Sequence, residues 1–172
     1  MLVLRAALAV LLVPFVLQAQ SDKAAKIDDA AIVGIFDAAN TWDITTGALA
    51  AKKGKRSEVA SFGAMLAHDH EVVRQQGRDL AKKLGVTPTP VAKDFALLKS
   101  HEEALRKLDG LTGAEFDRAF LEHEVAYHKA VIDAVTNAFL PAIQNAELKA
   151  FVLKVAPAFN AHMLAAKRLL DN

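Results

Sequence analysis

The stretch EVASFGAMLAHDHEVVRQQGRDLAKKLG, residues 58–85, decides the fold. Its apolar residues recur at steps of three, four or seven, which is the period of one face of an α-helix. His70 lies on this face between Leu66 and Val73, and Asp69 lies on its rim. A buried imidazole needs a hydrogen-bond partner or a ligand to offset the loss of water. The stretch therefore predicts a long helix that carries a polar group into the core. The apolar face consists of Val59, Phe62, Leu66, Val73, Leu80 and Leu84.

The composition is that of one all-helical domain. The chain has 172 residues, 53% of them hydrophobic, with a formal net charge of +1 and no cysteine. This length suffices for a single core. The charge offers no basic surplus for nucleic acid, so we expect no nucleic-acid partner. Without thiolates, any metal ion would be bound by nitrogen and oxygen atoms.

Residues 1–19 resemble a secretory signal peptide. Arg5 precedes a continuous apolar run, Ala6 to Val16, and Ala19 supplies a small residue at the expected cleavage point. The run is too short for a comfortable membrane span, and Pro14 interrupts it. We therefore predict an exported, periplasmic protein whose mature domain spans residues 20–172. A retained membrane anchor is the alternative, and no later stretch is apolar enough to cross a membrane.

The rest of the chain predicts further helices. Asp28 or Asp29 begins a helix that runs to about Lys53, and Ser57 is the predicted N-cap of the next, so a short turn joins an antiparallel hairpin. An extended linker at residues 86–91 leads to a short helix at residues 94–108. A capping box at residues 112–115 begins another long helix, which Pro141 closes, and Asn145 caps the last one. Pro157 predicts a kink or a restart in that helix.

The pattern predicts an all-α four-helix bundle with a short extra helix in the crossover between helices two and three. Each long helix also carries polar residues on its apolar face. If the crossover returns the chain to the end where the first hairpin turns, these residues share one depth within about two helical turns. The chain therefore predicts one buried polar cluster. Its members are Asp43, His70, Glu124, His128 and His162.

Two interpretations of this cluster stay open. The five side chains could hold one Zn, Cu or Fe ion, because imidazole and carboxylate suit these metals. They could instead form a hydrogen-bonded network that only fixes helix packing. A two-metal oxidase is a third reading, but such bundles use inward Glu-x-x-His pairs, which this chain lacks.

The remaining polar residues give weaker indications of function. His101 lies on the apolar stripe of the short helix and is interpreted as a satisfied core residue, whereas His68 points to solvent. Trp42 and Tyr127 are interpreted as packing residues with a polar tip. The basic run Lys52 to Arg56 is typical of a solvated turn, with a membrane surface as the alternative partner. No nucleophile motif or phosphate loop is present.

Four segments carry a family resemblance: 43–50 (DITTGALA), 58–70, 113–128 and 156–162. With them the chain resembles an exported bacterial family, domain of unknown function 4142, whose members are often labelled outer-membrane proteins. Asp69, His70, His128 and His162 match characteristic positions of that family, and Asp43 stands where the family usually has Glu. The resemblance implies an exported, ferritin-like helical bundle and implies no established activity. We expect a small binding or stress-related protein.

Overall fold

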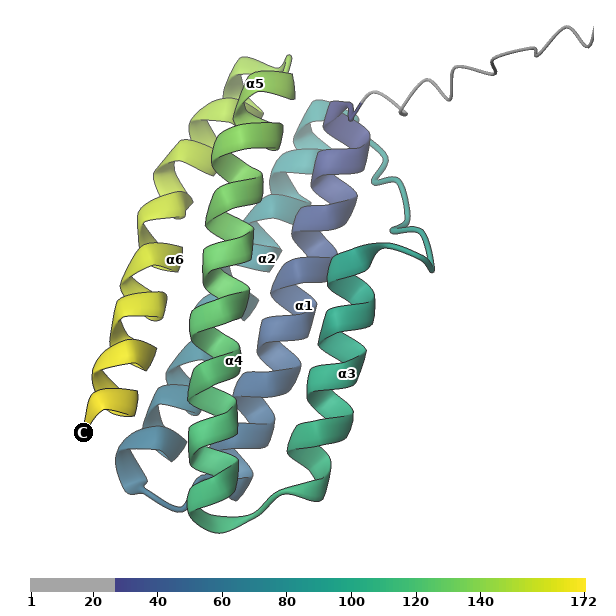
Figure 1. The fold of residues 1–172 in the computed structure, drawn as a ribbon. Helices are drawn as coiled ribbons and strands as arrows, with labels where there is room; N and C mark the ends of the chain where they lie inside the picture. The colour runs from purple at the N-terminus through teal and green to yellow at the C-terminus, as the bar shows by residue number, and fades with distance from the viewer. Residues whose placement is uncertain (1–26) are drawn as a thin grey trace, which may run out of the picture.

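A computed structural model describes residues 27–172 as long helices that lie side by side in a bundle (Figure 1). No strand occurs in this part of the chain, which confirms the all-α prediction. The predicted signal peptide at residues 1–19 lies outside the described residues. Among the helices of residues 27–172, none combines the length and the apolar character needed to cross a membrane.

The first two helices, α1 (Asp29–Lys53) and α2 (Ser57–Leu84), form the predicted antiparallel hairpin. Asp28 caps α1 by accepting a hydrogen bond from the backbone N–H of Ala31 at 2.8 Å. Gly85 ends α2 in the left-handed conformation, with a φ of 67°, as a helix-terminating glycine should.

The two helices of the hairpin approach each other closely at two glycines. A Cβ atom added at Gly47 would lie 2.7 Å from the carbonyl oxygen of Gly63. One added at Gly63 would lie 2.6 Å from the carbonyl oxygen of Gly47. Because both obstacles are backbone atoms, only glycine permits this contact. The spacing of α1 and α2, and hence of the side chains they carry inward, depends on it.

The start of α2 differs from the prediction. Arg56, not Ser57, is the N-cap residue, and its side chain makes no capping bond. The buried carboxylate of Asp117 in α4 (Gly113–Ala134) accepts hydrogen bonds from the backbone N–H groups of Lys55 and Arg56 at 2.8 and 2.9 Å. The turn is therefore held by a distant residue, which a local capping pattern cannot reveal.

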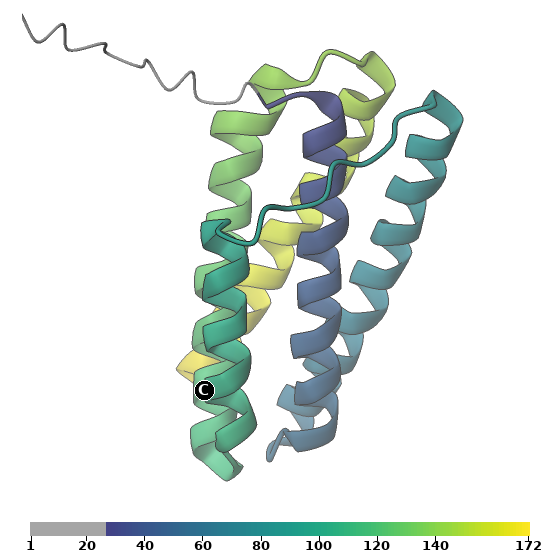
Figure 2. The same cartoon turned by 90° about the vertical axis from the view of Figure 1, so that its right-hand side faces the viewer.

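The crossover passes over α1 and enters α3 (Ala96–Gly110), as Figure 2 shows. The backbone N–H of Thr89 donates to the carbonyl oxygen of Ala30 at 3.0 Å, which ties the linker to α1. At the far end of α3, the ammonium group of Lys53 donates to the carbonyl oxygen of Leu108 at 3.0 Å. The crossover thus returns the chain to the end where α1 turns into α2, as expected.

The second half of the chain departs from the prediction in its details. Thr112 is the N-cap residue of α4, but its side chain makes no capping bond, so the predicted capping box does not form. After α4 the chain widens into a π-helix, η1 (Val135–Phe139), before the short helix α5 (Leu140–Ala142). Pro141 lacks the N–H that an α-helix would direct to residue 137, and the wider turn lies directly before it.

The last helix, α6 (Ala146–Asp171), begins as predicted. The Asn145 side chain accepts from the backbone N–H groups of Glu147 and Leu148. The helix then continues through Pro157 as one element, so of the predicted kink or restart the restart does not occur. Packing of its apolar face against α4 and α2 outweighs the loss of one backbone hydrogen bond at the proline.

The long helices run in alternating directions that their end contacts define. Asp117 joins the start of α4 to the start of α2, so these two helices begin at the same end. At the opposite end, the Asp29 carboxylate accepts from the backbone N–H groups of Gln144 and Asn145, which joins the starts of α1 and α6. Helices α1 and α6 therefore run one way, and α2 and α4 run the other.

The apolar core is divided into two clusters along the bundle. Each long helix contributes apolar residues to both of these clusters. Along each helix, the predicted polar residues lie between the apolar residues of one cluster and those of the other. The polar cluster is thus a layer between two apolar regions of the core. The cluster near the α1–α2 turn includes Ala50, Val59, Phe62, Leu66, Phe116, Phe120, Leu121 and Ala166. The other includes Ile32, Val33, Ala81, Val135, Phe139, Leu148 and Val152.

Candidate metal centre

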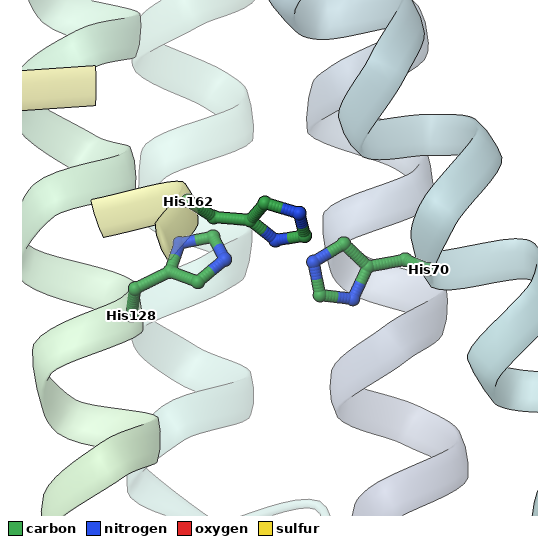
Figure 3. A group of neighbouring side chains, drawn as sticks. All are labelled: His70, His128 and His162. Carbon is green, nitrogen blue, oxygen red and sulfur yellow. The ribbon is translucent and has the colours of Figure 1, made fainter. Parts of the chain in front are cut away.

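The structure brings all five predicted site residues together. They come from every long helix and none is more than 6% exposed. They form two overlapping groups in which ligand atoms lie within 4.8 Å of one another, and His128 belongs to both. Figure 3 shows the three rings gathered between α2, α4 and α6. One group is His70, His128 and His162; the other is Asp43, Glu124 and His128.

The orientation of His70 is fixed by Asn40. The Asn40 side-chain N–H donates to the carbonyl oxygen of Phe36 at 2.7 Å, so the amide oxygen of Asn40 faces the ring. That oxygen lies 2.9 Å from Nδ1 of His70 and can only accept, so Nδ1 carries the hydrogen. The Nε2 atom of His70 is left without a hydrogen-bond partner. It lies 3.4 Å from Oδ2 of Asp43, which is longer than an ordinary hydrogen bond.

His128 is oriented by its own helix. Its Nδ1 atom donates to the carbonyl oxygen of Glu124, one turn earlier, at 3.0 Å. The Nε2 atom of His128 is buried and has no partner. Because Nδ1 carries the hydrogen, Nε2 of the neutral ring presents its lone pair to the centre of the cluster.

In His162 the roles of the two ring nitrogens are the reverse of those in His70 and His128. Its Nε2 atom donates to Oδ2 of Asp69 at 3.2 Å, across the interface between α6 and α2. Its Nδ1 atom is buried without a partner. The three ring centroids are 5.2 to 5.6 Å apart. Each ring therefore anchors one nitrogen on an outer acceptor and leaves the other free, as metal-binding histidines do.

The carboxylates complete the cluster on the α1 and α4 side. Oδ1 of Asp43 and both carboxylate oxygens of Glu124 are buried without hydrogen-bond partners. Burial raises the pKa of Asp43 well above its usual value, and the nearby Glu124 raises it further. Although burial opposes it, the neighbouring His128 ring, whose Nδ1 lies 3.4 Å from Oε2 of Glu124, holds the pKa of Glu124 below its usual value. Asp43 therefore carries a proton more readily than Glu124 does.

The three histidines of the cluster differ in pKa, and therefore in their charge near pH 7. Burial, with unfavourable electrostatic interactions with His128 and His162, lowers the pKa of His70 to about 2. Burial and His128 also lower the pKa of His162. Burial lowers the pKa of His128 as well, but the negative charges of Asp43 and Glu124 outweigh it and raise that pKa to about 9. His70 and His162 are thus neutral near pH 7, the state in which imidazole binds metals.

The neighbouring aromatic residues support the site. His101 is buried and stacks on Trp42 with ring centroids 5.6 Å apart, but its Nδ1 atom has no partner, so it is not the fully satisfied core residue that we predicted. The Tyr127 hydroxyl donates to the carbonyl oxygen of Ala39 at 2.9 Å, which ties α4 to α1 beside the cluster. His68 is exposed, as predicted.

Comparison with known proteins gives a family. The model of one family, Domain of unknown function (DUF4142), matches residues 15–169. This chain belongs to the DUF4142 family. No curated protein and no solved structure matches it. All five cluster residues fall within the matched part of this DUF4142 chain, and the family description assigns them no activity. The resemblance stated from sequence is therefore confirmed.

Two residues of the site received no role from the sequence. No role was assigned to Asn40, and Asp69 was placed on the rim of its helix without being identified as an acceptor for a histidine. Asn40 precedes Asp43 by three residues, so the two share a helix face. The partner of Asp69 lies on α6, and only the packing of α2 on α6 brings it to His162.

Proposed function

We propose that this DUF4142 protein binds one transition-metal ion in the buried cluster. The nitrogen ligands are Nε2 of His70, Nε2 of His128 and Nδ1 of His162. A carboxylate of Asp43 or Glu124 is the nearest further donor. Nitrogen and oxygen ligands of this kind suit zinc, copper or iron.

The observation that carries the proposal is the set of unpartnered atoms. The inward nitrogen of each of the three histidines is buried and lacks a hydrogen-bond partner. Leaving a buried polar group unpaired costs about 1–3 kcal/mol. A single cation would satisfy all three nitrogens together, displacing the Nε2 proton of His128. The outer acceptors Asn40, Glu124 and Asp69 already orient the rings for it.

The donor set favours one ion over a carboxylate-bridged pair. Two-metal carboxylate bundles place a Glu-x-x-His pair on each of two helices. Here the two members of the cluster that share a helix, Glu124 and His128, are four residues apart, and Nδ1 of His128 donates to the Glu124 carbonyl oxygen.

A second candidate is a structural network without metal. The raised pKa of His128 favours it, because an imidazolium between Asp43 and Glu124 would offset the negative charge of the cluster. In that case the cluster would only fix helix packing.

The broader proposal is an exported, ferritin-like four-helix bundle. Support for the fold comes from α1, α2, α4 and α6 running in two antiparallel pairs joined by one long crossover, the arrangement typical of ferritin-like bundles. Support for export comes from the signal-like residues 1–19. N-terminal sequencing of the protein from a periplasmic extract tests export: we expect the chain to begin near Gln20, and recovery with the cytoplasm would contradict it.

Metal analysis tests the proposed site. The tag-free protein is challenged separately with zinc, copper and iron salts, dialysed and analysed for bound metal beside a His70→Ala/His128→Ala variant. The exposed His68→Ala change is the control. We expect about one ion per chain in the parent and in the control, and none in the double variant. A parent that retains none of the three metals would favour the structural network.

A further inference from the structure

An open groove connects the buried cluster with the surface. It has a volume of about 210 Å³ and runs between α2 and α6. His70 and His162, two of the three histidines of the cluster, reach its wall, and His68 and Asp69 lie along it. This volume has room for several water molecules. The groove is therefore wide enough for an ion that arrives with part of its hydration shell.

Asp69 stands at the boundary between the groove and the cluster. Its side chain is 42% exposed, whereas that of His162 is 8% exposed. Its Oδ2 atom lies 3.2 Å from Nε2 of His162, whose other ring nitrogen is the buried, unpartnered Nδ1. One carboxylate thus touches both the solvent and a member of the cluster.

A second pocket reaches the cluster but suits a cation poorly. It has a volume of about 40 Å³ and touches Asp43 and His70 from the side of α1 and α3. Most of its wall is apolar. A cation crossing it would lose water without gaining ligands, which is costly in an apolar environment. The other wall residues include Phe36, Phe95, Leu97, Val131 and Phe139.

We propose that Asp69 captures a hydrated divalent cation in the groove between α2 and α6 and delivers it to the histidine cluster. The negative carboxylate raises the local concentration of cations and replaces part of their water shell. His162, bonded to Asp69, is the first ring that the ion meets. This inference rests on the proposed metal site and adds its loading route.

The rate of metal uptake tests the route. Association of Co²⁺ with the metal-free protein is followed by stopped-flow absorbance for the parent and for Asp69→Asn. Asparagine can still accept the hydrogen bond from His162 but lacks the charge. We expect association to slow by about tenfold at low salt, and the salt dependence of the rate to weaken, with the stoichiometry unchanged.

Glu58→Gln is the matched control. It makes the same charge change on an exposed residue of the same helix, about 16 Å along α2 from Asp69 at 1.5 Å per residue, and Glu58 does not line the groove. Its association rate should equal that of the parent. If Asp69 served only to orient His162, Asp69→Asn would change the dissociation rate of the metal and leave its association rate unchanged.

Narrowing the groove provides a second variant. Ala158 lines the groove, and Ala158→Phe should slow association and dissociation by similar factors, leaving the affinity near that of the parent. Parent-like association of either Asp69→Asn or Ala158→Phe overturns the route while the metal site stands. A parent that takes up no Co²⁺ or Zn²⁺ removes the metal proposal and the route with it.

Discussion

The Nδ1 atom of His128 donates a hydrogen bond to the carbonyl oxygen of Glu124, 3.0 Å away and one turn earlier in α4. The helix itself therefore sets the tautomer of the most buried ring in the cluster. The Glu124 side chain also lies beside the ring, with Oε2 3.4 Å from Nδ1. An i, i+4 pair on an apolar face thus supplies an inward-facing nitrogen and a neighbouring carboxylate from one helix.

Replacing Asn40 with leucine should weaken metal binding without abolishing it. The change removes the acceptor that holds Nδ1 of His70, and loss of such an outer partner typically lowers metal affinity about 10–100-fold. Competition titration with a chelator measures the affinity. Asn160→Leu, at an exposed position in α6, is the control, and equal affinities for Asn40→Leu and the parent would contradict the role given to Asn40.

Acid should destabilise the protein in part through His101. Burial, with the positive charge of His123, lowers the pKa of His101 from 6.5 to about 4, although Glu124 opposes the shift. Between pH 6.5 and 4 the unfolded chain therefore binds a proton at this residue that the folded protein does not. The stability contributed by neutral His101 is present above pH 6.5 and is lost as the pH falls toward 4.

His101→Phe isolates this effect, because phenylalanine keeps a ring against Trp42 without a titrating group. Urea unfolding at pH 7 and pH 4.5 measures the free energy of unfolding. The parent should lose on the order of 2 kcal/mol more than the variant between the two pH values. Equal losses in both proteins would show that His101 does not titrate in this window.

Gly63→Ala should separate α1 from α2. The new Cβ would lie 2.6 Å from both the Ala50 Cβ and the Gly47 carbonyl oxygen, so the helices must move apart. We expect a loss of about 1–3 kcal/mol in the free energy of unfolding, measured with urea. Gly110→Ala meets no atom within 4 Å and should leave stability unchanged or raise it. Similar stabilities for the two variants would contradict the close approach.

Asp117→Ala should loosen the turn between α1 and α2. It removes the acceptor of two backbone N–H groups, at Lys55 and Arg56. We expect a loss of about 2 kcal/mol in the free energy of unfolding. Hydrogen exchange at these two amides gives a direct local readout: it should accelerate in the variant, and unchanged protection would mean that another group holds the turn.

Helix periodicity predicted most of the fold and the members of the cluster. His70, His128 and His162 interrupt apolar stripes, and Asp43 and Glu124 lie on inward faces, so their burial followed from spacing alone. Their common depth followed from the direction in which the crossover returns the chain. These features depend on regular helix geometry, which a sequence encodes directly.

The details of the fold and the site that the sequence did not predict depend on contacts between residues far apart in the chain. Asp117 holds the start of α2 from a position 61 residues beyond Arg56, so Ser57 and the local capping pattern were misleading. Packing of α6 carries the helix through Pro157. The pairing of Asp69 with His162 likewise exists only because α2 packs on α6. A single sequence contains no signal for such pairs.

The most direct test of the central claim is anomalous diffraction from crystals of the metal-loaded protein, collected at the absorption edge of the bound metal. We predict one strong peak about 2.0–2.1 Å from each of Nε2 of His70, Nε2 of His128 and Nδ1 of His162. A peak bound to Nε2 of His162, or no peak inside the bundle, would contradict the arrangement of inward nitrogens on which the proposed metal site depends.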